Sequence, residues 1–319
     1  MQNFIWVSTA TLARQQHRYW RFIRIDLGIM KRLLSGRKDG SLGFEAKLTA
    51  QQITEISNIS TSVDLPSEIH RKQRGLNCLG YWKGSEFSSF LHYTSLIFLE
   101  GNVADSVFEH FLLFFCSITL FSTSYYKKYW TTASKMLEQY VVPSEDLYGS
   151  RYITSNVHNL LHVAQEVYRF APLSTLSVYP TENALGLMKG LIRHGYRILE
   201  PAVNRLSKIE EEGNETMEEK TYPIINLCAN RKQELVDENF ILDCIRKNSF
   251  FSTKDNKIIQ LKKVEQRTGQ PIELFGNEFL SKTDRFSTPI HVSDIRCKLA
   301  ALDYKNDNYL MVPVVHTLR

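Results

Sequence analysis

Residues 210–219 read EEEGNETMEE, and this stretch separates two parts of the chain that differ in pattern. Six of its ten residues are glutamates, and Met217 is its only strongly apolar side chain. Such a run repels itself and cannot bury enough apolar surface to form a core. We therefore expect an acidic linker at 210–221, between one region at 1–209 and a second, smaller domain at 222–319.

Before this linker, apolar residues recur at the spacing of helices. Ile53, Ile56 and Ile59 fall on one helical face, and Thr49 stands where an N-cap is expected. The segment VFEHFLLFFCSITLF at 107–121 is shorter than the roughly 20 residues that cross a bilayer, so it indicates a buried helix and no membrane partner. Helices are expected at 48–60, 82–98, 105–121, 125–140, 156–170 and 181–193.

After the linker, the pattern changes to short apolar runs bounded by Gly, Pro and Asn. Runs at 257–264, 271–276 and 308–315 are typical of β-strands. The expected fold class is therefore α+β, with a mainly helical N-terminal region and a small β-rich C-terminal domain. A barrel with SH3-like or BAH-like connectivity is one expectation for that domain.

Composition sets limits on the partners and the compartment. The net charge of +5 permits a polyanionic partner without requiring one. Five cysteines without a CxxC pair argue against a disulfide framework, and the N-terminus does not have the pattern of a signal peptide. A nuclear or cytosolic protein without a small-molecule substrate fits these features best.

Two features in the last third of the helical region have the residue types of metal sites. His158 and His162 are four residues apart, which places both imidazoles on one helical face. Glu182 follows Thr181, a plausible N-cap, in a first helical turn. The alternatives are an ordinary amphipathic histidine pair and a glutamate that stabilises the helix dipole by roughly 0.3–1 kcal/mol.

These features occur among several ordered motifs. Upstream stand LPSEIHRKQRGL at 65–76, YWKGSEF at 81–87 and FLHYT at 90–94, and downstream stand NVH at 156–158, His162, EVYRF at 166–170 and SVYPTEN at 177–183. In this order they resemble the CACTA-type (tnp2-like) DNA transposases and their transposon-encoded relatives in animals. The resemblance covers about residues 27–319.

The resemblance implies an RNase H-like DDE domain, of which the helical region would hold the insertion and the last helix. Glu182 would match the last catalytic carboxylate, which in such enzymes binds Mg²⁺ together with two aspartates. The histidine pair, His158 and His162, would then supply half of a Zn²⁺ site. In this family the reaction is metal-dependent phosphoryl transfer on DNA.

One departure from the family pattern concerns the active site itself. Leu27-Gly28 is present, but Trp20 and Ile23 stand where the family has an aspartate and a histidine, and Asp26 is out of register. One carboxylate cannot hold two Mg²⁺ ions, which prefer oxygen-rich octahedral surroundings. We therefore expect Glu182 to be vestigial and the chain to lack strand-transfer activity on its own.

A basic stretch after Glu182 suggests a second function. Lys189, Arg193 and Arg197 would contact DNA phosphates, which favours a domesticated DNA- or chromatin-binding protein. An ordinary solvated helical face is the alternative for these residues. A third hypothesis is a protein-interaction module built on the β-rich domain.

Overall fold

The computed structural model describes residues 24–42, 47–176, 204, 207–208, 221–227, 233–267, 269–279, 289–304 and 308–319. The chain divides into two compact units, Met1–Phe22 with Leu176–Tyr222 and Ile23–Thr175 with Pro223–Arg319. Nearly all the described residues belong to the second unit. The acidic run at 210–219 and the helix expected at 181–193 lie outside the described residues.

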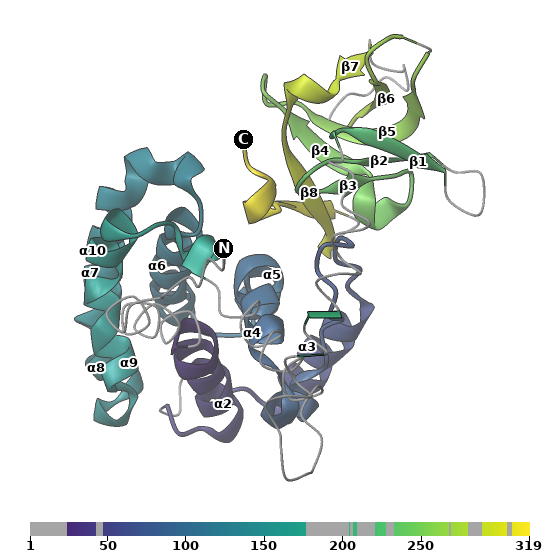
Figure 1. Ribbon diagram of the computed structural model, residues 1–319. Helices are drawn as coiled ribbons and strands as arrows, with labels where there is room; N and C mark the ends of the chain where they lie inside the picture. Colours follow the sequence, from purple (N-terminus) through teal and green to yellow (C-terminus); the bar gives the residue numbers. More distant parts are fainter. Residues whose placement is uncertain are drawn as a thin grey trace. The chain divides into compact units, whose positions relative to one another are not determined.

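The first part of the second unit is helical, as expected (Figure 1). Its α-helices are α2 (Lys31–Asp39), α3 (Ala50–Ser62), α4 (Gly84–Ser89), α5 (Ser95–Leu99), α6 (Asp105–Phe121), α7 (Trp130–Val141), α8 (Ser144–Tyr148), α9 (Ser155–His158) and α10 (Val163–Arg169). Two π-helical segments, η1 (Arg24–Met30) and η3 (Phe90–Thr94), and the 3-10 turns η2 (Leu76–Tyr81), η4 (Ser124–Tyr129), η5 (Ser150–Tyr152), η6 (Asn159–His162) and η7 (Leu173–Leu176) connect them.

Helix α3 confirms the predicted N-cap. The Thr49 hydroxyl accepts a hydrogen bond from the Gln52 backbone N–H, and the Gln52 side chain accepts one from the Thr49 N–H. This reciprocal pair satisfies two of the backbone donors that a helix start leaves open. Ile56 is buried, while Ile53 and Ile59 are half-buried, so the predicted face does point inward.

The helix expected at 82–98 differs from the structure in two respects. It begins at Gly84, because the Glu86 carboxylate accepts a 2.8 Å hydrogen bond from the Lys83 backbone N–H and ends the extended segment there. It then runs through η3 into α5 and ends at Leu99. All five residues of η3 are buried, so this local widening of the helix is enclosed by the core.

Strands and short turns make up the rest of the unit. They are β1 (Ile224–Leu227), β2 (Gln233–Val236), β3 (Ile241–Leu242), η8 (Arg246–Asn248), β4 (Phe250–Thr253), β5 (Ile258–Glu265), β6 (Glu273–Glu278), β7 (Ile290–His291), η9 (Val292–Asp294), β8 (Ile295–Tyr304), β9 (Asn308–Pro313) and η10 (Val315–Thr317). The expected α+β class is thus confirmed, and β5, β6 and β9 fall where strands were predicted.

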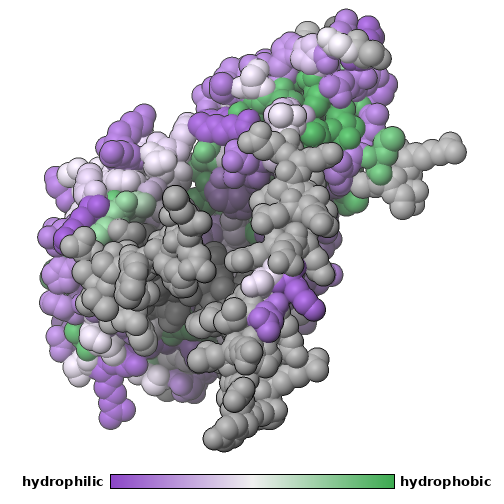
Figure 2. All heavy atoms as spheres, viewed as in Figure 1, coloured by the Kyte–Doolittle hydropathy of each residue, from purple (hydrophilic) through white to green (hydrophobic). Residues whose placement is uncertain are grey.

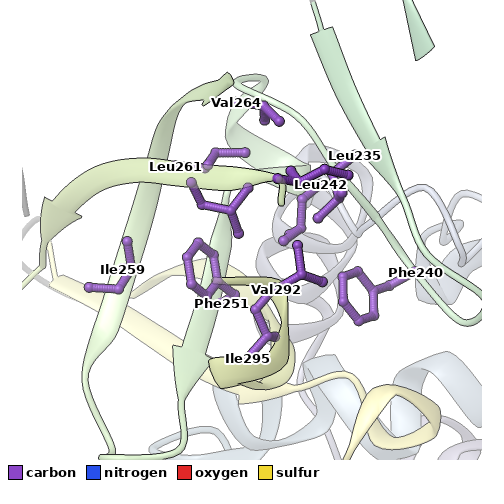
Figure 3. Packing of buried hydrophobic residues seen from close by; sticks show 11 residues of the cluster. Leu235, Phe240, Leu242, Phe251, Ile259, Leu261, Val264, Val292 and Ile295 are labelled. Carbon is purple, nitrogen blue, oxygen red and sulfur yellow. The ribbon is translucent and has the colours of Figure 1, made fainter. Parts of the chain in front are cut away.

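The strands form two antiparallel sheets, ordered β1-β2-β3 and β7-β6-β5-β4-β8-β9. Among the described residues no pairing closes either sheet, so the expected barrel is not seen in these strands. Figure 3 shows Leu235 and Leu242 of the smaller sheet and Phe251 and Ile259 of the larger sheet in a single apolar cluster, with Ile259 on the side away from the two leucines. Side chains from both sheets therefore share one core.

Side-chain size matters at one point of the larger sheet. A β-carbon at Gly276 would lie 2.4 Å from the Gln260 carbonyl oxygen of the neighbouring strand. Only glycine lets β5 and β6 approach this closely.

The described atoms on the face shown in Figure 2 are largely hydrophilic over the helices, and hydrophobic atoms gather over the strands. None of the described helices is both long enough and apolar enough to cross a membrane.

Candidate functional site

Most of the predicted site residues cannot be located. Glu182 and the basic residues Lys189, Arg193 and Arg197 lie outside the described residues. Their predicted roles as a vestigial carboxylate and as DNA contacts stay predictions.

His158 and His162 do lie side by side, at the end of α9 and in η6. Their ring centroids are 5.7 Å apart and the rings meet edge to face, and both residues are exposed. A structural Zn²⁺ ion takes four ligands. The described residues bring no third His, Cys, Asp or Glu to this pair, so the histidines present do not fit a complete zinc site.

The segment before this pair contacts the Leu27-Gly28 motif. A β-carbon at Gly28 would lie 2.6 Å from the Asn156 side-chain nitrogen, so the π-helix η1 and the start of α9 are in close contact, and a larger residue at 28 would require the Asn156 side chain to shift. Asp26, on the same π-helix, is buried. The structure therefore brings together two motifs that are more than a hundred residues apart in the sequence.

The three upstream motifs, at 65–76, 81–87 and 90–94, contact one another. The first of these contacts joins Arg74 to Glu86. The Arg74 Nε and a terminal guanidinium nitrogen each donate a 2.7 Å hydrogen bond to the Glu86 carboxylate. The Glu86 side chain is fully buried, whereas that of Arg74 is 40% exposed. Burial alone would raise the pKa of the Glu86 carboxyl, but the bonds from Arg74 and from the Lys83 backbone lower it below its usual value.

Two further contacts link the three motifs. The Thr94 hydroxyl donates a 2.9 Å hydrogen bond to the Gln73 side-chain oxygen, and both residues are buried. The Trp82 indole donates to the Gly75 carbonyl oxygen at 3.3 Å and lies against the rings of Phe87 and Phe90. We call residues 65–94, which contain these three motifs, the motif cluster.

The motif cluster is anchored to the β strands by one buried charge. The Lys298 side chain is fully buried on β8, and its Nζ lies 2.8 Å from both carboxylate oxygens of Glu68. Lys298 also donates to the Ile241 carbonyl oxygen and to the Asn248 side chain, which in turn bonds to Ser67. All three donor positions of the ammonium are thus occupied.

A pocket of about 240 Å³ opens beside this anchor, lined by residues of the segment 63–73 and by Lys247. Arg71 and Lys72 are exposed on its lining, and Gln73 is buried. A larger, shallow hollow of about 520 Å³ lies along the surface of α3 alone. Its only charged lining residue is Glu55, so of the two it is the less suited to an anion.

Sequence reasoning missed Lys298, Glu68 and Gln73 as site residues. Glu68 and Gln73 stand inside a quoted motif, but nothing in that motif indicates which of its charges are buried. Lys298 interrupts the apolar pattern of β8, whose sequence is IRCKLAALDY. A lysine within an otherwise strand-like run was the one available signal.

His92, in the third motif, predicts a pH dependence of stability. Burial lowers the pKa of His92 to about 4, from 6.5 in the unfolded chain. The unfolded state therefore binds the extra proton between these values, and stability falls as pH is lowered from 6.5 toward 4. Between pH 7 and pH 4.5 this group should cost about 2–3 kcal/mol.

The measurement is urea unfolding at both pH values for the native chain and for His92→Leu. The carboxylates and the other histidines titrate in both proteins, so the difference isolates His92. The native chain should lose about 2–3 kcal/mol more than the variant on acidification. An equal loss in both would show that His92 is not held neutral.

Comparison with known proteins adds one finding. Residues 218–296 match a family described as a domain of unknown function, DUF8592. No curated protein and no solved structure matches the chain. The matched segment runs from just before β1 into the first residues of β8, and so includes Lys247 and Asn248 but ends before Lys298.

Proposed function

We propose that this chain is a transposon-derived protein that resembles the C-terminal part of a CACTA-type DDE transposase and has kept DNA binding without strand transfer of its own. It would act in the nucleus or the cytosol. Mg²⁺ would belong to the parent enzymes, and Glu182 would be the remnant of their active site. The oligomeric state is left open.

The observation that carries this proposal is the interlocking of the quoted motifs. A chance likeness in three separate short segments would not require their side chains to bond to one another. Here Arg74 of the first motif holds Glu86 of the second, and Gln73 of the first holds Thr94 of the third. The three motifs thus form one bonded unit, as expected if they were inherited together.

The charges of the motif cluster support DNA as the partner. Arg74 forms an ion pair with Glu86, and Lys298 forms one with Glu68, so these two cations are neutralised inside the protein. Arg71 and Lys72 are exposed, and within the described part of the chain no ion pair involves them. Exposed cations that are in no ion pair are suited to phosphate oxygens.

A cleavage assay tests the loss of strand transfer. Supercoiled plasmid carrying terminal inverted repeats would be incubated with the chain and Mg²⁺ or Mn²⁺. The fraction of nicked plasmid would then be quantified on an agarose gel. We expect no nicking above the level without protein. Metal-dependent nicking that Glu182→Ala abolishes would mean that an intact active site is assembled after all.

The second candidate function is a protein-interaction module built on the β strands. The match to the DUF8592 family falls on this part, from just before β1 to the first two residues of β8, and does not include the helical part. This alternative predicts no binding of duplex DNA even at low salt. It would then be the better account of the chain.

A further inference from the structure

We propose that the pocket beside the motif cluster binds one phosphate group of the DNA backbone. This inference rests on the proposed function and names where one contact of that function is made. The ligand is a phosphate group, and its source is duplex DNA.

The size of the pocket favours a small group. Pockets for drug-sized ligands measure about 300–1,000 Å³, and this one measures about 240 Å³. Most of the charged residues that line the pocket are positive. Arg71, Lys72 and Lys247 contribute three cations, against the single carboxylate of Asp64.

Asp64 does not cancel this charge. It is exposed, and it lies close enough to Arg246 to raise the pKa of that guanidinium, although the hydrogen bond from Arg246 to Asp303 raises it more. The Asp64 carboxylate is thus attracted to a cation outside the pocket lining. Lys247, by contrast, lies near a second positive charge, because it helps to lower the pKa of the buried Lys298 after burial itself. An anion in the pocket would relieve that repulsion.

A buried donor without a partner points to the same ligand. Gln73 is 4% exposed and lines the pocket. Its side-chain oxygen accepts from Thr94, but its side-chain nitrogen is buried and has no hydrogen-bond partner among the described residues. A buried amide N–H left unpaired is costly. The nitrogen is closed to solvent in this conformation, so a phosphate oxygen would satisfy it with a charge-assisted hydrogen bond when the Gln73 side chain turns toward the pocket.

The geometry also predicts how many phosphates the pocket holds. Lys72 and Lys247 come from segments far apart in the sequence and line the same pocket. If they share one phosphate, removing both should take away one phosphate contact. The dependence of log K on log[KCl] changes by about 0.9 for each phosphate of duplex DNA.

The test is fluorescence anisotropy of a labelled duplex at 50–200 mM KCl, with the full chain. In Lys72→Ala/Lys247→Ala the salt slope should fall by about 0.9, rather than by the roughly 1.8 expected if each lysine held its own phosphate. The loss should be equal for two duplexes of unrelated sequence. The matched control Lys135→Ala removes an exposed lysine of α7 that does not line the pocket, and the double variant should lose more slope than this control.

A second arm uses inorganic phosphate alone. Thermal unfolding in phosphate and in KCl of equal ionic strength should show a higher Tm in phosphate, a shift lost in Lys72→Ala/Lys247→Ala and kept in Lys135→Ala. Gln73→Glu, which replaces the donor by a carboxylate, should lose the shift as well; circular dichroism at 25 °C checks that it folds.

Together, the two experiments distinguish a failure of the pocket assignment from a failure of the proposed function. Native DNA binding with an unchanged slope in the double variant would overturn the pocket assignment and leave the proposed function standing. Absence of native DNA binding together with a phosphate shift would overturn DNA as the source, and the proposed function with it. Absence of both would overturn the phosphate site altogether.

Discussion

Replacing Glu68 by glutamine is expected to lower the free energy of unfolding by about 3–5 kcal/mol. Lys298 is fully buried, and Glu68 supplies its only carboxylate partner among the described residues. The substitution keeps the size of the side chain but removes the carboxylate bonded to the ammonium, and leaves only the weaker attraction of Asp243. Such a charge costs far more than a surface ion pair contributes.

Urea unfolding at pH 7 measures this effect, and Glu55→Gln on the exposed side of α3 is the matched control. The control should change stability by less than about 0.5 kcal/mol. The double variant Glu68→Leu/Lys298→Met should lose less than Glu68→Gln alone, since it buries no unpaired charge. A loss below about 1 kcal/mol in Glu68→Gln would mean that water reaches Lys298.

The stability of Glu68→Gln should also change with pH, and its direction follows from the pKa of Lys298. Burial lowers the pKa of Lys298, and Glu68 partly restores it. Without Glu68 the folded-state pKa falls further below the unfolded value, so the unfolded chain binds the extra proton. Stability of Glu68→Gln should therefore rise as pH is raised from 7 toward 10, more than that of the native chain.

Trp82→Ala should also lower the free energy of unfolding by about 3–5 kcal/mol, the range for deleting a buried aromatic side chain. Trp82 is 3% exposed and packs against Phe87 and Phe90. The substitution removes this contact, opens a cavity, and leaves the Gly75 carbonyl without the indole donor. The change falls at the centre of the motif cluster.

The neighbouring residue provides a strict control for this prediction. Tyr81 is 77% exposed, so Tyr81→Ala removes an aromatic ring of similar size from the surface. Its effect should stay within about 0.5 kcal/mol. Guanidinium unfolding of both variants gives the comparison, and similar losses in the two would show that Trp82 is not packed as described.

Local patterns predicted the elements that local forces decide. Helix α6 occupies 105–121, the range its apolar residues indicated, and Thr49 caps α3. Strand β5 at Ile258–Glu265 follows the alternation at 257–264. In each case the side chains that decide the element lie within a few residues of one another.

The site could not be predicted in the same way, because its contacts are distant in sequence. Lys298 is 230 residues from Glu68, and no spacing rule links them. Strand β8 was not predicted, although Ile295 to Leu299 alternate apolar and charged residues as a strand does. Lys298 is tolerated inside because the motif cluster brings Glu68 to it. For the histidine pair, the spacing in the sequence correctly placed His158 beside His162. It could not predict whether further metal ligands lie near them.

The measurement that tests the account most directly is the salt dependence of duplex binding by the native chain. Arg71, Lys72 and Lys247 line the pocket that holds one phosphate, so at least one phosphate should be contacted, which gives a slope of log K against log[KCl] of about −0.9 or steeper. The affinity should then fall about threefold or more between 50 and 200 mM KCl. No binding at 50 mM, or binding that salt leaves unchanged, would contradict it.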